Sequence, residues 1–196
     1  MTTCKIQCHL KYKIVQATEF VFLIHVADHP DQKIIAEQLS FYPPVTWREF
    51  HDPSQQNRYV RLHVEACDAF EVNYSATVER HPMINADVQH NLKEVSISDL
   101  PDEVLPYLLA SRYCNSDLLV DMANRSFAWM EPGYTRVKAI EQWIYHNIFY
   151  VSGSSNQFTT ATDVLIHRAG VCRDFAHLGI SLCRALGIPA RMVVGY

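Results

Sequence analysis

The first part of the chain places apolar side chains at every second position. Over residues 4–14, apolar residues alternate with lysine, glutamine and histidine. Because successive side chains of a strand point to opposite faces, this alternation predicts a strand with one buried face. Residues 70–79 alternate in the same way, and the continuous apolar run over 21–27 suits an interior strand. Further strands are predicted at 33–41, 45–50 and 58–64.

Turn-forming residues separate these predicted strands. Proline, aspartate, asparagine and serine gather at residues 28–31, 42–44 and 52–57, and each of these residue types favours turns. Six or so short strands at this spacing are typical of an antiparallel β-sandwich. We therefore predict a β-sandwich domain over residues 1–95.

The pattern of apolar positions changes in the second half of the chain. Three prolines interrupt residues 82–115, which we interpret as a linker that packs against one or both domains. Apolar residues then recur every three or four positions, the spacing of one helix face. We predict one helix that begins at Ser116 and ends before residues 131–133. A second helix is predicted to begin at Thr135, since serine and threonine cap helix N-termini.

The next predicted helix contains the most informative residues of the chain. Residues 170–178 read Gly-Val-Cys-Arg-Asp-Phe-Ala-His-Leu, and the helical apolar spacing continues to Leu186. Gly187 is placed to end this helix, and Pro189 prevents its continuation. After it, residues 191–194 predict a strand that enters a core.

Cys172 lies in the first turn of this predicted helix, just past a glycine turn. Upstream, a short helix over 163–167 is predicted to be capped by Thr160 or Thr162 and to be ended by Gly170. At a helix start, unpaired N–H groups and the positive end of the helix dipole stabilise a thiolate. The same N–H groups can donate to an oxyanion when the thiolate attacks an amide carbonyl. Cys172 is therefore a candidate nucleophile, whereas the other cysteines are interpreted as small core residues.

These residues resemble the transglutaminase-like superfamily, a branch of the papain-like cysteine enzymes, and in particular its bacterial cysteine-protease type. The resemblance is carried by residues 170–178, 184–191 and 194–196, while 107–114 resembles the linker before the catalytic domain. Bacterial members also carry a β-rich N-terminal region. The resemblance implies an α+β protein with an N-terminal β-sandwich. A linker and a partial, mainly helical papain-like core, truncated after its first strand, would then occupy residues 96–196.

The resemblance also implies a catalytic triad in which Cys172 is the nucleophile. In this family the general-base histidine and its orienting aspartate lie on strands that follow the Gly-Tyr pair matched here at residues 195–196. We therefore expect that histidine and aspartate after Tyr196, in a longer polypeptide. As a consequence, we expect the 196-residue chain by itself to be inactive.

The sequence directs no histidine of the chain toward Cys172. His177 lies five residues beyond it, about 140° around the helix, and is expected to point away from the thiol. His167 and His146 lie on other predicted segments, and nothing directs them to Cys172. Asp174 is expected to complement the helix dipole or to bond a neighbouring loop.

The chemistry expected of Cys172 is amide cleavage through a thioester and an oxyanion held by backbone N–H groups. Water would then complete hydrolysis of a peptide or glutamine-type amide, whereas a lysine amine would complete cross-linking; we favour hydrolysis. Asn147, Tyr150 and Gln157 are candidates for the second oxyanion donor by position alone.

Two alternatives to an amide-cleaving enzyme stay open. One is a catalytically inactive binding or scaffold protein on the same fold. The other is a glycan-releasing amidase of the same superfamily, although the sequence lacks the zinc-binding CxxC pairs typical of those enzymes.

Composition and charge narrow the classes of partner. Hydrophobic residues make up 48% and charged residues 19% of the chain, so it can bury a core of one or two domains. The net charge of −4, without a basic stripe, gives no support to a nucleic-acid or acidic-membrane partner. The longest apolar run, 20–27, is too short to span a bilayer, and no secretory signal is recognised. A peptide or protein substrate is the expected partner, and the oligomeric state is left open.

Cysteine usage points to a reducing compartment. Cys4 and Cys8 on one predicted strand are too far apart for a disulfide, and so are Cys172 and Cys183 on one predicted helix. No CxxC or HExxH spacing provides a metal site, and we expect no cofactor. Unpaired thiols fit the cytoplasm.

Overall fold

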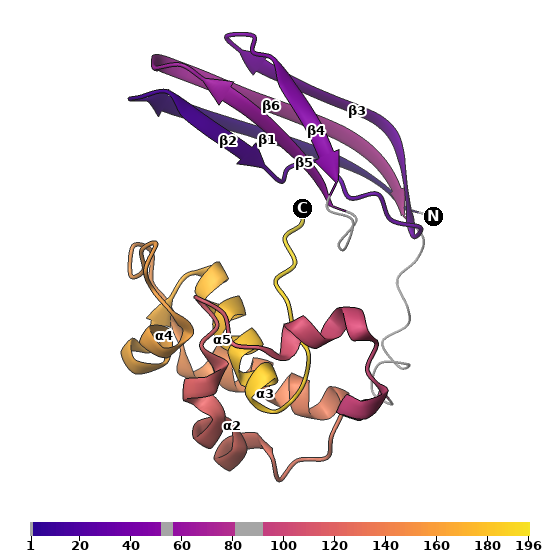
Figure 1. The fold of residues 1–196 in the computed structure, drawn as a ribbon, viewed down its shortest axis with the longest axis vertical. Coiled ribbons are helices and arrows are strands. Elements are labelled where there is room, and N and C mark those ends of the chain that lie inside the picture. Colours follow the sequence, from indigo (N-terminus) through magenta and orange to yellow (C-terminus); the bar gives the residue numbers. More distant parts are fainter. Residues whose placement is uncertain (1, 52–56, 81–91) are drawn as a thin grey trace. The chain divides into compact units, whose positions relative to one another are not determined.

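The computed structural model describes residues 2–51, 57–80 and 92–196. Within these residues the chain forms two compact units, one up to residue 80 and the other over 92–195. Strands make up the first unit and helices dominate the second (Figure 1). The predicted fold class, an N-terminal antiparallel β region followed by a mainly helical part, is confirmed.

Two three-stranded antiparallel sheets form the first unit, with strand orders β1-β6-β3 and β2-β5-β4. The strands are β1 (Thr2–Ile14), β2 (Thr18–Phe22), β3 (Gln32–Tyr42), β4 (Trp47–His51), β5 (Arg58–Val64) and β6 (Cys67–Arg80). All except β2 match the predicted strands closely. The predicted turn at 52–57 falls almost wholly outside the described residues.

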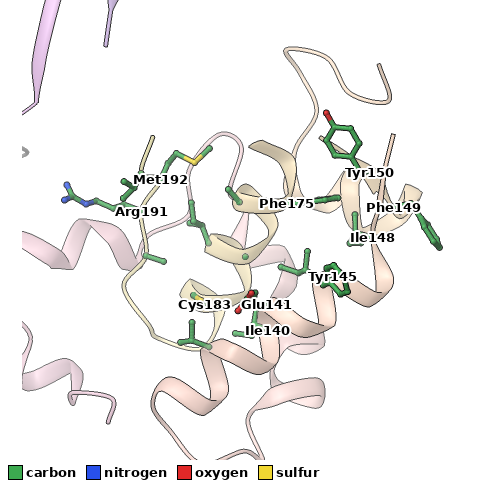
Figure 2. A pocket seen from close by; sticks show the side chains of 17 residues that line it. Ile140, Glu141, Tyr145, Ile148, Phe149, Tyr150, Phe175, Cys183, Arg191 and Met192 are labelled. Carbon is green, nitrogen blue, oxygen red and sulfur yellow. The ribbon is translucent and has the colours of Figure 1, made fainter. Parts of the chain in front are cut away.

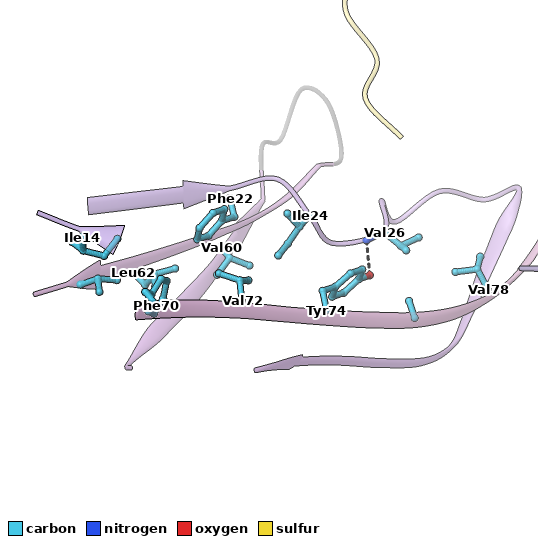
Figure 3. Close-up of a cluster of buried hydrophobic side chains, with 12 residues drawn as sticks. Ile14, Phe22, Ile24, Val26, Val60, Leu62, Phe70, Val72, Tyr74 and Val78 are labelled. Atoms are coloured by element: carbon cyan, nitrogen blue, oxygen red, sulfur yellow. Dashed lines mark hydrogen bonds between the residues drawn. The ribbon is translucent and has the colours of Figure 1, made fainter. Parts of the chain in front are cut away.

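The alternation of apolar residues explains how the first unit is packed. Every second side chain of β6 from Phe70 to Val78 is buried, and β5 buries alternate side chains from Val60 to Val64. These faces of the two sheets share one hydrophobic core (Figure 3). The polar residues between them remain on the outer faces, as is usual for antiparallel sheets.

The predicted strand over 21–27 is only partly correct, because β2 ends at Phe22. Val26 is buried in the core, but its backbone bonds to side chains instead of to a strand. Its N–H donates to the hydroxyl of Tyr74 at 2.9 Å (Figure 3), and its carbonyl accepts from Arg58 at 3.3 Å. An apolar run thus enters the core here without joining a sheet.

Helix α5 is the centre of the second unit. It packs against α2, α3 and α4, and its Leu178 and Leu182 are fully buried. The helices are α2 (Val120–Phe127), α3 (Tyr134–Asn147), α4 (Ala161–His167) and α5 (Cys172–Ala185). Short 3₁₀ helices occupy Ile97–Asp99, Asp102–Leu108 and Ser116–Leu119, and a two-strand parallel sheet pairs β7 (Phe149–Tyr150) with β8 (Ala169–Gly170).

The predicted helical segments are observed, but two of the predicted helix starts are wrong. Ser116 lies in a 3₁₀ helix whose N-cap is Asn115, and α2 itself begins only at Val120.

The cap of α3 is Gly133 rather than Thr135. Gly133 has a φ of 132°, and a Cβ there would lie 2.4 Å from the carbonyl oxygen of Leu92. Its N–H donates to the carboxylate of Glu94 at 3.0 Å. Close approach of the backbone near residue 92 therefore decides where α3 begins.

The predicted strand over 191–194 is wrong for the described chain. Gly187 ends α5 with a φ of 78°, as expected, but residues 188–196 form no helix or strand. A strand needs a neighbour that completes its backbone hydrogen bonds, and no described strand pairs with this segment. The apolar side chains of Val193 and Val194 consequently remain exposed.

Candidate active site

Helix α5 begins at Cys172, and a carboxylate fixes this helix start. Val171 is the N-cap residue and has an extended backbone. Its N–H donates to Oδ2 of Asp174 at 2.8 Å, and its carbonyl accepts from the N–H of Asp174 at 2.9 Å. The acidic residue in the first turn also interacts favourably with the helix dipole. The backbone is thereby held on both sides of Cys172, whose side chain is exposed.

Asp174 is a buried carboxylate, and only 1% of its surface is exposed. Burial alone would raise the pKa of Asp174, but hydrogen bonds from Ser155, the Val171 N–H and Arg173 lower it overall. The carboxylate is therefore ionised at neutral pH. Asp174 both bonds the helix N-terminus and contacts the loop that contains Ser155, so both roles expected from the sequence are observed.

Gly170 does not form the turn predicted before Cys172. It belongs to β8, and its φ lies outside the left-handed region. A Cβ at this position would lie 2.8 Å from the Cβ of Asp174 and 3.3 Å from its Oδ2. Glycine is required because the buried Asp174 side chain passes close to the backbone. The left-handed residue that ends α4 is instead Arg168, with a φ of 52°.

Replacing Gly170 by alanine should destabilise the protein by about 1–3 kcal/mol, because the new methyl group overlaps Asp174 and one of the two must shift. Urea unfolding followed by circular dichroism measures the change. Gly179→Ala is the matched control, since its Cβ would meet only Ile144 at an ordinary 3.5 Å. That change in a helix interior should stabilise by about 0.5–1 kcal/mol. A neutral or stabilising Gly170→Ala would contradict the close approach.

The loop that follows β7 lies beside the start of α5. The N–H of Val151 donates to the carbonyl of Gly170 at 3.0 Å. The guanidinium of Arg173 donates to Oγ of Ser155 at 3.3 Å and to the carbonyl of Asn156 at 3.0 Å. Residues on both sides of Cys172 in the sequence therefore bond this loop.

The histidines of α3, α4 and α5 make no hydrogen bond to Cys172. His177 stacks on the ring of Tyr113, with ring centres 5.3 Å apart. Burial lowers the pKa of His177 below its ordinary value. The Nδ1 of His146 lies 2.7 Å from the carbonyl of Gln142, and His167 is exposed at the end of α4. Among the described residues, no hydrogen bond joins Cys172 to a histidine.

The three candidates for the second oxyanion donor, Asn147, Gln157 and Tyr150, have different hydrogen-bond partners and exposure. The side-chain amide of Asn147 donates to the carbonyl of Trp143 at 2.8 Å and is committed within α3. The carbonyl of Gln157 accepts from the hydroxyl of Tyr113 at 3.0 Å. Tyr150 is exposed, and its ring lies edge-on to Phe175, one helical turn from Cys172.

An apolar groove of about 750 Å³ runs along α5. Helix α3 forms one wall, and residues 190–193 form part of the other; Figure 2 shows Met192 on one rim and Tyr150 near Phe175 on the other. Phe175 and Ala176 of α5 line the groove. Because residues three and four apart share a helix face, Cys172 lies at the end of that same face.

The described residues contain no group of three or more histidine, cysteine, aspartate or glutamate side chains that could hold a metal ion. No helix among them is long and apolar enough to cross a membrane.

Comparison with protein families covers both units. Residues 2–103 match the bacterial transglutaminase N-terminal domain, and residues 120–196 match the core of the transglutaminase-like superfamily. The chain belongs to the transglutaminase-like superfamily. Cys172 and the loop beside it lie within the matched core.

This transglutaminase-like chain matches only part of the length of each of its relatives. The solved structure of a "Putative Cysteine Protease" from Cytophaga hutchinsonii is 41% identical, with a TM-score of 0.87, and the match covers 95% of this chain and 64% of that one. An uncharacterized protein of Mycobacterium leprae is 29% identical over 128 residues, which is 64% of this chain and 45% of that protein. An uncharacterized protein of Mycobacterium tuberculosis is 37% identical over 81 residues, covering 41% and 26%. The chain thus spans less than two thirds of these relatives.

The start of α5 could be placed from the sequence, but the loop contacts of Arg173 could not. Arg173 adjoins Cys172 in the sequence, yet its partners Ser155 and Asn156 lie 18 and 17 residues away. Tyr113 is further still from His177 and Gln157. Periodicity cannot pair such residues, because the contacts depend on where a loop folds back.

Proposed function

We propose that Cys172 is the nucleophile of a transglutaminase-like cysteine enzyme that acts on peptide or glutamine-type amides, most readily as a hydrolase. The observation that carries the proposal is the exposed thiol at the first residue of α5. The first N–H groups of an α-helix have no partner within the helix, so those beside Cys172 can donate to an oxyanion. Membership of the family and the neighbouring cysteine-protease structure support this role.

The proposed reaction passes through a thioester. The Cys172 thiolate attacks the amide carbon, and the C–S bond forms as the carbonyl π electrons move to oxygen. Backbone N–H groups at the start of α5 would stabilise the resulting oxyanion. Collapse breaks the C–N bond, and the amine leaves with a proton from the general acid. Water then adds to the thioester, releasing a carboxylic acid and the thiol.

The proposed base is a histidine that residues after Tyr196 would supply, together with an aspartate that orients it. Two observations support this assignment. No described histidine bonds Cys172, and burial and stacking against Tyr113 occupy His177. The first residue of α5 that lines the apolar groove is Phe175, one helical turn after Cys172, so a segment lying over the groove could bring a base to the thiol.

Hydrolysis is favoured over cross-linking because the Cys172 side chain is open to solvent in the described chain. Cross-linking requires a lysine amine to outcompete water for the thioester, which needs a site that excludes water. An exposed thiol does not provide that exclusion.

Cys172 should react with iodoacetamide faster than the other cysteines at pH 7.5. Cys114 and Cys183 are buried, and burial raises the pKa of Cys183 to about 11. Because the thiolate is the reactive form, a thiol with a pKa of about 11 should alkylate on the order of 100-fold more slowly at this pH than an ordinary exposed cysteine. Cys4 and Cys67, which are partly buried, should be intermediate. Mass-spectrometric mapping of the alkylated peptides measures each rate.

The same measurement in urea provides the control, because unfolding should bring all the cysteine rates close together. A Cys172 that alkylates no faster than Cys4 and Cys67 in the folded chain would leave only an inert cysteine at the helix start, and the proposed function would fail.

A further inference from the structure

Arg173, the residue directly after the proposed nucleophile, is held at three points although it lies at the surface. Its side chain is 46% exposed. Nε donates to Oδ1 of Asp174 at 3.4 Å, while one terminal nitrogen donates to Oγ of Ser155 and to the carbonyl of Asn156. A single ion pair of an exposed arginine commonly contributes little to the stability of a protein. The planar guanidinium here joins three acceptors from two segments, which suits a role in orienting the loop.

Further bonds give the loop over residues 151–159 a defined shape. Ser154 donates its N–H and its hydroxyl to the carbonyl of Val151, and Gly153 has a φ of 78°, as a tight turn requires. The N–H of Asn156 donates to Oγ1 of Thr159, and Tyr113 donates to the carbonyl of Gln157.

The attachments of this loop converge on Cys172. Val151 is bonded to Gly170, two residues before the thiol, and the 155–156 segment is bonded to Arg173, one residue after it. Without Arg173, the contact between Ser155 and buried Asp174 would remain, but the Asn156 carbonyl would lose its donor from α5.

We propose that Arg173 is a positioning residue that holds residues 151–157 as a fixed wall beside the Cys172 thiol and so limits the width of the acyl group that can reach it. This inference rests on the proposed function, because it assigns the wall to the nucleophile of that reaction. We therefore expect the Cys172 thiol to react more readily with narrow reagents than with wide ones. This preference should depend on the guanidinium of Arg173.

Arg184 provides a matched control on the same helix. Its guanidinium donates to the carbonyls of Ala190 and Leu109 and to the hydroxyl of Ser111. It therefore also joins α5 to neighbouring segments, but at the opposite end of the helix, about 18 Å from Cys172 by helical rise. Arg184→Met removes a comparable set of hydrogen bonds without touching the loop.

The experiment compares alkylation of Cys172 by iodoacetamide and by the bulkier N-(1-pyrenyl)maleimide, each rate divided by its value in urea. In the unsubstituted chain, the rate relative to urea should be higher for iodoacetamide than for the bulkier maleimide. Arg173→Met should lower that preference by about fivefold, the equilibrium effect of losing a hydrogen bond of about 1 kcal/mol. Arg173→Lys keeps the charge but cannot reproduce the forked contacts, so it should lower the preference in the same direction. Arg184→Met should leave it unchanged.

Buried Cys183 reports in the same samples on any general loss of structure. Simple destabilisation by Arg173→Met would speed alkylation of Cys183 along with Cys172, and that outcome would overturn the positioning role. An unchanged size preference in both Arg173 variants, with Cys172 still the fastest thiol, would overturn it too and leave the proposed function standing. A slow Cys172 in the unsubstituted chain would instead refute the proposed function itself.

Discussion

Replacing Cys172 by alanine should abolish amide cleavage in a longer polypeptide that carries these residues followed by the expected histidine and aspartate. The loss should be on the order of 10⁶-fold, as when a nucleophile is removed from a well-studied serine protease. The reason is that this substitution removes the sulfur atom that forms the thioester intermediate. Release of a fluorescent amine from peptide amides, and of ammonia from glutamine-containing peptides, would measure the rate.

Cys67→Ala is the control for this substitution, because Cys67 is a partly buried residue of β6 in the first unit. It should leave the rate essentially unchanged. Cleavage that survives Cys172→Ala at a similar rate would refute the thiol mechanism. A longer polypeptide that is inactive in every form, while its first unit captures a protein partner, would support the scaffold alternative.

The 196-residue chain alone should cleave amides at least roughly 10⁴-fold more slowly than that longer polypeptide. Within the described residues His177 stacks on Tyr113, and no histidine bonds Cys172. Without a base, only oxyanion contacts and substrate binding remain, and they supply a small part of such a rate enhancement. The same fluorescent assay on equal amounts of the two polypeptides would measure the difference.

Activity of the short chain comparable to that of the longer one would show that a base lies within these residues. His177→Gln and His167→Gln would then identify it. Retention of full activity in both variants, together with loss in Cys172→Ala, would point to another group as the base.

Much of this fold could be predicted because its elements have clear periods. The two-residue alternation of β1 and β6 and the helical spacing of α5 each place one apolar face toward a core. The end of α5 just before Gly187 followed from local residue preferences, whereas its start at Cys172 was predicted in part from a turn that Gly170 does not form. Such features depend on neighbours in the sequence, so the sequence displays them.

The errors concern features that depend on distant residues. The run 21–27 is apolar enough for a strand, but Tyr74 and Arg58 take the backbone bonds of Val26. Gly170 suggested a turn, whereas its lack of a side chain accommodates Asp174. No local pattern distinguishes a glycine that turns the chain from one that lets a buried side chain pass.

The most direct test of the central claim is to trap the acyl-enzyme. The longer polypeptide would be mixed with a p-nitrophenyl ester of a short peptide, quenched in acid within seconds and digested for mass-spectrometric mapping. We expect one acyl group per chain, attached to Cys172, released by neutral hydroxylamine as a thioester should be, and absent from Cys172→Ala. Continued turnover with an unmodified Cys172, or with the acyl group on another residue, would contradict the central claim.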